Sequence, residues 1–180
     1  MRLATTIIPW EHAGPHAAQA GQNVTLTLAQ RRHSRQRLVL SDGEAVGLSI
    51  ARGIVLHDGD LLDTADGRYI RVIAAHEDLL RVTSGSHRAL TCAAYHLGNR
   101  HVALEVADGY LQLGYDAVLA DMLAHLPDVK AERVQAPFEP EAGAYGGGHH
   151  HGHDETFEED YALAQAAFHA HDKPHPGHHS

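Results

Sequence analysis

Residues 86–113 read SHRALTCAAYHLGNRHVALEVADGYLQL, and the spacing of their apolar side chains changes from helical to alternating. Ser86 is a suitable N-cap, because its hydroxyl can accept a hydrogen bond from a free amide of the first helical turn. The apolar side chains that follow recur with the period of one helix face: Leu90, Ala93, Ala94 and Leu97. Gly98 is expected to end this helix. Residues 101–107 then alternate, which predicts a strand with His101 pointing away from its buried face.

The flanking sequence extends this stretch to a β-α-β-β-α-β unit. Asp108-Gly109 is a turn signal between two alternating runs. Asp116 is expected to cap a second helix, which Pro127 ends. The apolar side chains expected on the buried face of that helix are Val118, Leu119, Met122, Leu123 and Leu126. With strands near 79–83 and 130–136, the order of elements is that of a ferredoxin-like fold.

Residues 3–84 alternate in short runs that Asp-Gly turn signals separate, at Asp42-Gly43, Asp58-Gly59 and Asp66-Gly67. Asp-Gly is a strong hairpin signal, since both residues tolerate a positive φ. We therefore expect an α+β chain in three parts: a small all-β N-terminal domain over residues 1–78, a ferredoxin-like metal-binding and dimerisation domain over residues 79–145, and a flexible His-rich tail over residues 146–180.

Arginines cluster in one of the N-terminal runs, at Arg31, Arg32, Arg35 and Arg37. We interpret them as a solvated strand edge, which discourages pairing with another chain. The alternative is a docking surface for an acidic partner.

The charge and composition exclude several classes of protein. The 180 residues carry 14 basic and 23 acidic side chains, a formal charge of -9 with histidine neutral, so a nucleic-acid partner is not expected. No apolar run approaches the roughly 18 residues of a membrane helix. Residues 1–20 lack the pattern of a signal peptide, so we expect a cytoplasmic protein. A single cysteine, Cys92, excludes an internal disulfide framework.

Histidine makes up 18 of the 180 residues, and half of these histidines lie near the C-terminus. The predicted ligands in this tail are His149, His150, His151, His153, His169, His171, His175, His178 and His179. Imidazole suits nickel, zinc, copper and iron, and the interleaved carboxylates favour octahedral coordination. His-rich segments of this kind are typical of metal-binding tails. An affinity tag is the alternative, but tags are uninterrupted histidine runs.

His101 is the candidate ligand in the folded part. For a single outward histidine the ordinary interpretation is a surface imidazole, but in a symmetric dimer one histidine becomes two facing nitrogens. His96 lies on the same side of the predicted helix as Cys92, and either could contribute; Cys92 is more often a small packed residue. The remaining histidines have no spacing that suggests a site: His12, His16, His33, His57, His76, His87 and His125.

Catalytic motifs are absent from the sequence: there is no His-Glu-x-x-His, Gly-x-Ser-x-Gly or phosphate-binding Gly-rich loop. We therefore do not expect an enzyme. A metalloenzyme that uses His96 and His101 is the alternative, but Glu105 is the only carboxylate positioned to serve as its base.

Three motifs resemble the urease accessory protein UreE family. They are YHLGNRH at residues 95–101, VLADML at residues 118–123 and PFEPEAGAY at residues 137–145, just before the His-rich tail. The similarity extends in matching order from about Asp42 to Tyr145, with the Arg52-Gly53 and Gly59-Asp60 turns.

The resemblance implies a nickel metallochaperone for urease maturation. Members of the family pair an N-terminal β domain with a ferredoxin-like domain, dimerise through the latter and bind Ni(II) at the interface, with Zn(II) or Cu(II) as further ions in vitro. They pass nickel to the GTPase UreG and the urease apoprotein complex. The family's interface ligand is the histidine of Gly-Asn-Arg-His, which here is His101.

One departure from the family concerns a second internal site. Some relatives carry two further histidines before the second helix, where this chain has Tyr115 and Ala117. More of the additional binding is therefore expected of the tail. A nickel or zinc store without a delivery partner is the alternative function.

Overall fold

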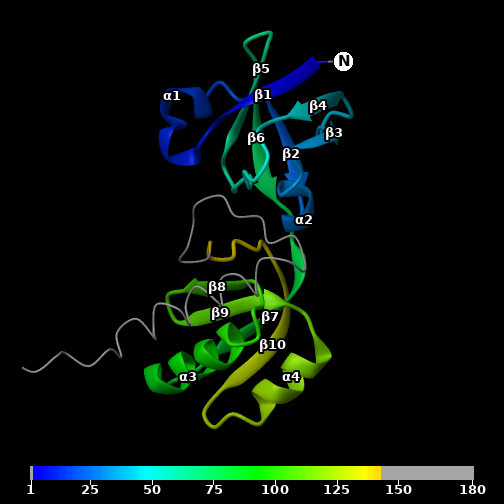
Figure 1. Cartoon of the computed structure of the whole chain (residues 1–180). Coiled ribbons are helices and arrows are strands. Elements are labelled where there is room, and N and C mark those ends of the chain that lie inside the picture. Colours follow the sequence, from blue (N-terminus) through cyan, green and yellow to red (C-terminus); the bar gives the residue numbers. More distant parts are fainter. Residues whose placement is uncertain (1, 143–180) are drawn as a thin grey trace, which may run out of the picture. The chain divides into compact units, whose positions relative to one another are not determined.

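The computed structural model describes residues 2–142, whose strands form two separate sheets (Figure 1). The first sheet has six strands in the order β2-β6-β5-β1-β4-β3. They are β1 (Arg2–Ile8), β2 (Gln22–Leu26), β3 (Arg35–Val39), β4 (Ala45–Ser49), β5 (Leu61–Thr64) and β6 (Tyr69–Ala74). Three short helical segments lie between them: η1 (Trp10–His12), α1 (Gly14–Ala17) and α2 (Leu28–Arg31). The N-terminal half is therefore β-rich, as the alternating sequence predicts.

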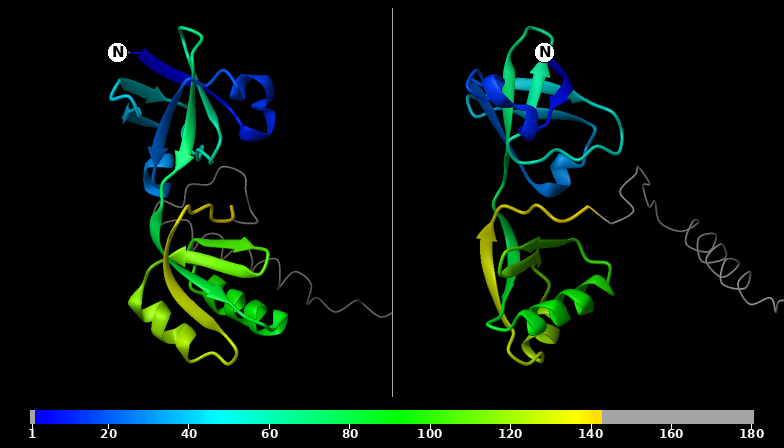
Figure 2. Two further views of the ribbon diagram at one scale, coloured as in Figure 1. Left: turned by 180° about the vertical axis from the view of Figure 1, so that it is seen from behind. Right: turned by 90° about the vertical axis from the view of Figure 1, so that its left-hand side faces the viewer.

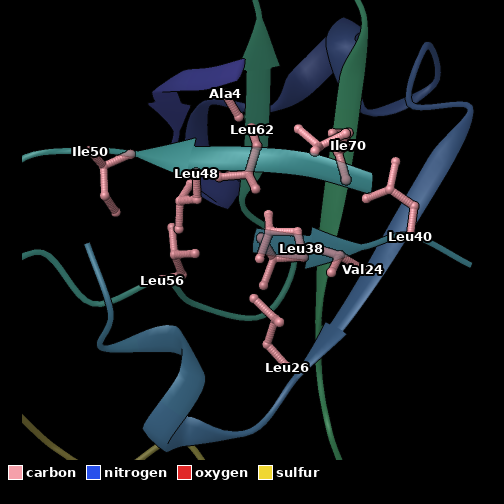
Figure 3. Close-up of a cluster of buried hydrophobic side chains, with 12 residues drawn as sticks. Ala4, Val24, Leu26, Leu38, Leu40, Leu48, Ile50, Leu56, Leu62 and Ile70 are labelled. Atoms are coloured by element: carbon pink, nitrogen blue, oxygen red, sulfur yellow. The ribbon is translucent and has the colours of Figure 1, made fainter. Parts of the chain in front are cut away.

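Side chains from these strands and from the segments that follow β3 and β4 meet in one apolar core (Figure 3). Its buried members are Ala4, Val24, Leu26, Leu38, Leu40, Val46, Leu48, Ile50, Leu56, Leu62, Ile70 and Val72. Fully burying one of the larger side chains contributes roughly 1.5–3 kcal/mol, so this set is the main source of stability for the first sheet.

Two of the three Asp-Gly turns in the N-terminal half join antiparallel strands, as predicted. Asp42-Gly43 joins β3 to β4 and Asp66-Gly67 joins β5 to β6. Asp58-Gly59 does not join two strands, because the residues before it, 51–57, form no strand. Leu56 lies in that stretch and is nevertheless fully buried, so its apolar character reflects packing and not strand pairing.

The second sheet has four antiparallel strands in the order β10-β7-β9-β8. They are β7 (Glu77–Thr83), β8 (Leu104–Ala107), β9 (Tyr110–Gly114) and β10 (Lys130–Ala136), with α3 (His87–Gly98) between β7 and β8 and α4 (Ala117–Ala124) between β9 and β10. The predicted β-α-β-β-α-β order is therefore present. Both helices cover the same face of the sheet (Figure 2). None of the helices in residues 2–142 is long and apolar enough to span a bilayer.

The helices pack on this sheet through a second core. Its buried members are Leu80, Val82, Ala93, Leu97, Leu111, Leu113, Leu119 and Leu123. Two side chains predicted to be packed lie outside it: Val118 is 77% exposed, and Cys92 is exposed. Val118 directly precedes the buried Leu119, and successive helical residues point about 100° apart, so α4 has a narrower apolar face than the spacing suggested.

A third, smaller apolar cluster links the two halves of the described chain. Leu28 at the start of α2 packs with Leu79 of β7, Ala136 of β10 and Phe138 just beyond β10. Leu28 lies within residues 3–84, where we expected short strands only, but Thr27 caps a helix there. The Thr27 hydroxyl accepts from the backbone amide of Gln30, and the Gln30 side-chain oxygen accepts from the backbone amide of Thr27.

The cap of α4 gives the first prediction. The Asp116 carboxylate accepts hydrogen bonds from the amides of Val118 and Leu119, at 2.8 and 2.9 Å. Asp116→Ala should lower the free energy of unfolding by about 1 kcal/mol, measured by urea titration. Asp121→Ala, an exposed position on the same helix, is the control and should have little effect. Equal effects of the two changes would mean that the cap does not stabilise α4.

Candidate metal centre

His101 lies in the turn between α3 and β8, and its backbone is left-handed, with φ 53°. The prediction of a strand from residue 101 is wrong at its start, since β8 begins three residues later at Leu104. The predicted end of the helix at Gly98 is confirmed, since Gly98 is the last residue of α3. The amides of Arg100 and His101 donate to the carbonyls of Leu97 and Gly98, both at 3.0 Å, so the helical turn continues until His101 reverses it.

This backbone conformation is a strained one. Left-handed φ values are uncommon outside glycine, although Asn, Asp and His adopt them more often than other residues. Such a residue costs on the order of 1–3 kcal/mol, and residues of this kind concentrate at functional sites. The His101 side chain is exposed. The turn therefore presents an accessible imidazole from a fixed point of the backbone.

The neighbouring side chains on α3 are mostly open to solvent. His96 is half-buried, with its ring edge against Tyr95 at 5.7 Å between centroids, and Tyr95 is 66% exposed. The Arg100 guanidinium donates to the His96 carbonyl at 2.9 Å, which holds the end of the helix. Within residues 2–142, no three His, Cys, Asp or Glu side chains lie close enough together to hold a metal ion. Within the described residues, His101 is thus a candidate ligand without two others beside it.

Comparison with known proteins decides the family. The family model described as "UreE urease accessory protein, N-terminal domain" matches residues 4–75, and the C-terminal domain model of the same family matches residues 77–180. The chain belongs to the UreE family. The resemblance carried by the YHLGNRH and PFEPEAGAY motifs is thereby confirmed.

Similar proteins carry the same family name. A urease accessory protein UreE of Bordetella pertussis is 57% identical over 173 residues, which cover 96% of this chain and 84% of that protein. One from Cupriavidus necator is 55% identical over 157 residues, covering 87% of this chain and 81% of that protein. A bifunctional urease accessory protein UreEF of Bordetella bronchiseptica is 57% identical over 173 residues, 96% of this chain and 40% of that protein.

The positions where some UreE relatives carry further histidines have other roles in this chain. The Tyr115 ring lies 4.1 Å from the guanidinium of Arg133, an attractive cation–π geometry. Ala117 is the first residue of α4, and the carboxylate of Asp116 between them is used as the helix cap. These two positions therefore provide no imidazole for a second metal site.

The predicted tail ligands lie outside the described residues. They are His149, His150, His151, His153, His169, His171, His175, His178 and His179, all beyond residue 142. Their assignment as ligands stays a prediction, as does that of His101.

Two features near the site had weak signals or none in the sequence. The left-handed turn at His101 has one signal: Asn99 and His101 belong to residue types that tolerate such conformations. The contacts of Arg31 had no signal in the sequence. We grouped Arg31 with the solvated arginines of a strand edge, but it is fully buried. Arg35 and Arg37, by contrast, are exposed on β3, an edge strand, as predicted.

Asp78 and Arg133 give a prediction for the pH dependence of stability. Arg133 donates two hydrogen bonds to Asp78, at 2.7 and 2.5 Å, which lowers the pKa of Asp78 from its ordinary 3.8. The stability gained is present above about pH 3.8 and is lost as the pH falls through the lower pKa of the folded state.

The change Asp78→Asn should therefore reduce stability at neutral pH and make its decline below pH 4 shallower, in urea titrations repeated from pH 2 to 7. The control is Asp121→Asn, whose nearest charged contact is His125 at 4.0 Å. If Asp78→Asn and the parent lost stability in parallel below pH 4, the pair would not contribute.

Proposed function

We propose that the chain is a nickel metallochaperone that binds Ni(II) through His101 and delivers it to the urease maturation complex. Membership of the UreE family gives it a role in urease maturation. Nickel as the cargo is supported by the chemistry of the ligands, since imidazole suits nickel and the chain is one tenth histidine. The observation that carries the proposal is the exposed imidazole of His101 on a strained, fixed turn.

A homodimer through the C-terminal domain would supply the second ligand. Two copies related by a two-fold axis would place two His101 imidazoles at one interface. Exposed apolar side chains on this part of the chain support such an interface: Tyr95, Val106, Tyr115 and Val118, which are 41–77% exposed. The domain limits that go with this proposal are residues 1–78, 79–145 and a tail from 146.

The tail histidines would complete the coordination sphere and bind additional ions. Zinc and copper bind the same ligands, and copper binds more tightly than nickel in general, so geometry and supply would decide selectivity. Ligating imidazole must be neutral, and therefore nickel affinity should fall as the pH drops below about 6.5. Weak tethered ligands around two fixed ones suit an ion that has to be passed on.

The proposed recipients are UreG and the urease apoprotein complex, in the cytoplasm, and the chain itself would catalyse no reaction. The relative described as bifunctional UreEF joins two accessory activities in one protein, which supports a place among other accessory proteins.

The rival function is a nickel or zinc store without a recipient, which the nine tail histidines favour. Nickel-dependent capture of purified UreG supports delivery, whereas no capture at any nickel level favours storage.

The change His101→Asn tests the site. Asparagine tolerates the left-handed backbone, so the turn should survive while the imidazole is lost. Mutating a residue that hydrogen-bonds to a metal ligand typically lowers metal affinity about 10–100-fold. Loss of the ligand itself should lower the nickel affinity by at least the upper value. Nickel titration calorimetry measures this change, with circular dichroism to check the fold.

The matched control for this change is His125→Asn, an exposed histidine at the end of α4. His125→Asn should bind nickel like the parent. Parent-like nickel affinity in His101→Asn would contradict the assignment of His101.

Truncation after Tyr145 tests the tail. It removes nine histidines, so the number of nickel ions bound per chain should fall while the dimer persists in sedimentation analysis. An unchanged metal-to-protein ratio, measured by equilibrium dialysis, would remove the tail from the proposal.

A further inference from the structure

The hairpin of β3 and β4 carries arginines that have no carboxylate partner within residues 2–142. Arg35 and Arg37 are exposed on β3, the edge strand of the first sheet (Figure 1). Arg32 lies shortly before this strand and Arg52 shortly after β4, and both are exposed. No Asp or Glu oxygen of the described residues lies within 4.0 Å of a nitrogen of these four side chains. The hairpin therefore presents a group of unpaired positive charges.

Most other cationic side chains of the described residues have a partner. Those that pair with carboxylates are Arg2, Arg31, Arg68, Lys130 and Arg133. Those that donate to uncharged oxygens are Arg71, Arg81 and Arg100. The chain as a whole has a formal charge of -9. The hairpin of β3 and β4 is therefore the part of the described surface that best suits an anionic partner.

Apolar side chains lie on the same face of the sheet as these arginines. Val39 follows Arg37 by two residues on β3 and is 60% exposed. Arg37 pairs with Gly47 of β4, which in turn pairs with Leu3 of β1, and Leu3 is 44% exposed. Because residues paired across strands share one face, Leu3, Arg35, Arg37 and Val39 form a single exposed surface, the arginine face. It combines guanidinium groups with apolar contact area, as the centres of protein interfaces do.

We propose that the arginine face binds an extended, acidic segment of a partner protein. Charge complementarity identifies the partner, since guanidinium groups form paired hydrogen bonds with carboxylates. Alternate residues of a strand lie about 7 Å apart, so Arg35 and Arg37 match two carboxylates at alternate positions of an extended chain. An apolar residue at the next alternate position would contact Val39. The inference goes beyond the proposed function, because it concerns the first sheet and needs no metal.

A nucleic acid is the other polymer that exposed arginines bind. Its charge is dense, with one phosphate per nucleotide, so the overall charge of -9 would repel it along much of its length. A short acidic segment carries few charges and can also contact Leu3 and Val39. The observations therefore favour a protein segment.

The experiment measures binding of a fluorescent synthetic peptide to the full-length protein by fluorescence anisotropy. In the peptide, two glutamates alternate with serine, and valine occupies the next alternate position. Arg37→Glu removes an attraction and adds a repulsion, so it should weaken binding about tenfold. Arg37→Lys keeps the charge but loses the paired hydrogen bonds, and its affinity should lie between those of the parent and Arg37→Glu.

The matched control is Arg88→Glu, which reverses the charge of an exposed arginine on α3 and should bind the peptide like the parent. A peptide of the same composition with adjacent glutamates should bind more weakly, because its carboxylates point to opposite sides of an extended chain. Raising the salt from 0.1 to 1 M shortens the Debye length from about 10 to 3 Å and should weaken binding of the alternating peptide.

Three results would overturn the proposal: no binding of the alternating peptide to the parent, equal binding by the parent and Arg37→Glu, or equal losses in Arg37→Glu and Arg88→Glu. Tighter binding of a single-stranded DNA oligonucleotide than of the peptide, lost in Arg37→Glu, would assign the face to nucleic acid instead. If Arg37→Glu fails to fold by circular dichroism, Arg35→Glu should show the same loss. Nickel titration of Arg37→Glu should match the parent, so failure of the His101 site and failure of the arginine face are separate results.

Discussion

The reversal of the chain between α3 and β8 is the constraint on which the candidate site depends. Ala93 and Leu97 fix α3 on the sheet, and Leu111 and Leu113 fix the strand beside β8, so the few residues between helix and strand have little freedom. The left-handed φ of His101 closes the turn. The same turn that strains the backbone leaves the His101 imidazole exposed to solvent, which is why we place the proposed metal site there.

The fold of the second sheet was predictable because its signals are local. The i, i+3, i+4, i+7 spacing around Leu90 and Leu97, the Asp116 cap and the alternation on each side fix the order of elements without tertiary information. The helix end at Gly98 was predictable from its residue type. The start of the next strand was not: β8 begins at Leu104 and not at residue 101, because the left-handed turn at His101 lies before it.

The sequence also could not predict which side chains are buried by contacts with distant parts of the chain. Arg31 and Arg35 look alike in sequence, but Arg31 ends a helix that faces the segment after β10, whereas Arg35 lies on an open edge strand. Only the partner supplied by Glu139, 108 residues away, distinguishes them. Val118 is the opposite case: its apolar side chain was predicted to be buried, but it is exposed, because the exposure depends on how much of α4 the sheet covers. The site divides likewise: the histidine-rich motifs indicate metal, while the contacts of residues 138–141 with α2 and β8 are long-range and have no signal in the sequence.

In the proposed site, one imidazole per chain, a second copy and weak tail ligands would together favour exchange of the ion over its retention. The direct test is a crystal structure of the nickel-loaded full-length protein with anomalous scattering recorded at the nickel edge. We predict a peak on the two-fold axis of a dimer, about 2 Å from an imidazole nitrogen of His101 in each copy. A tight nickel ion bound elsewhere, with both His101 side chains free, would contradict it.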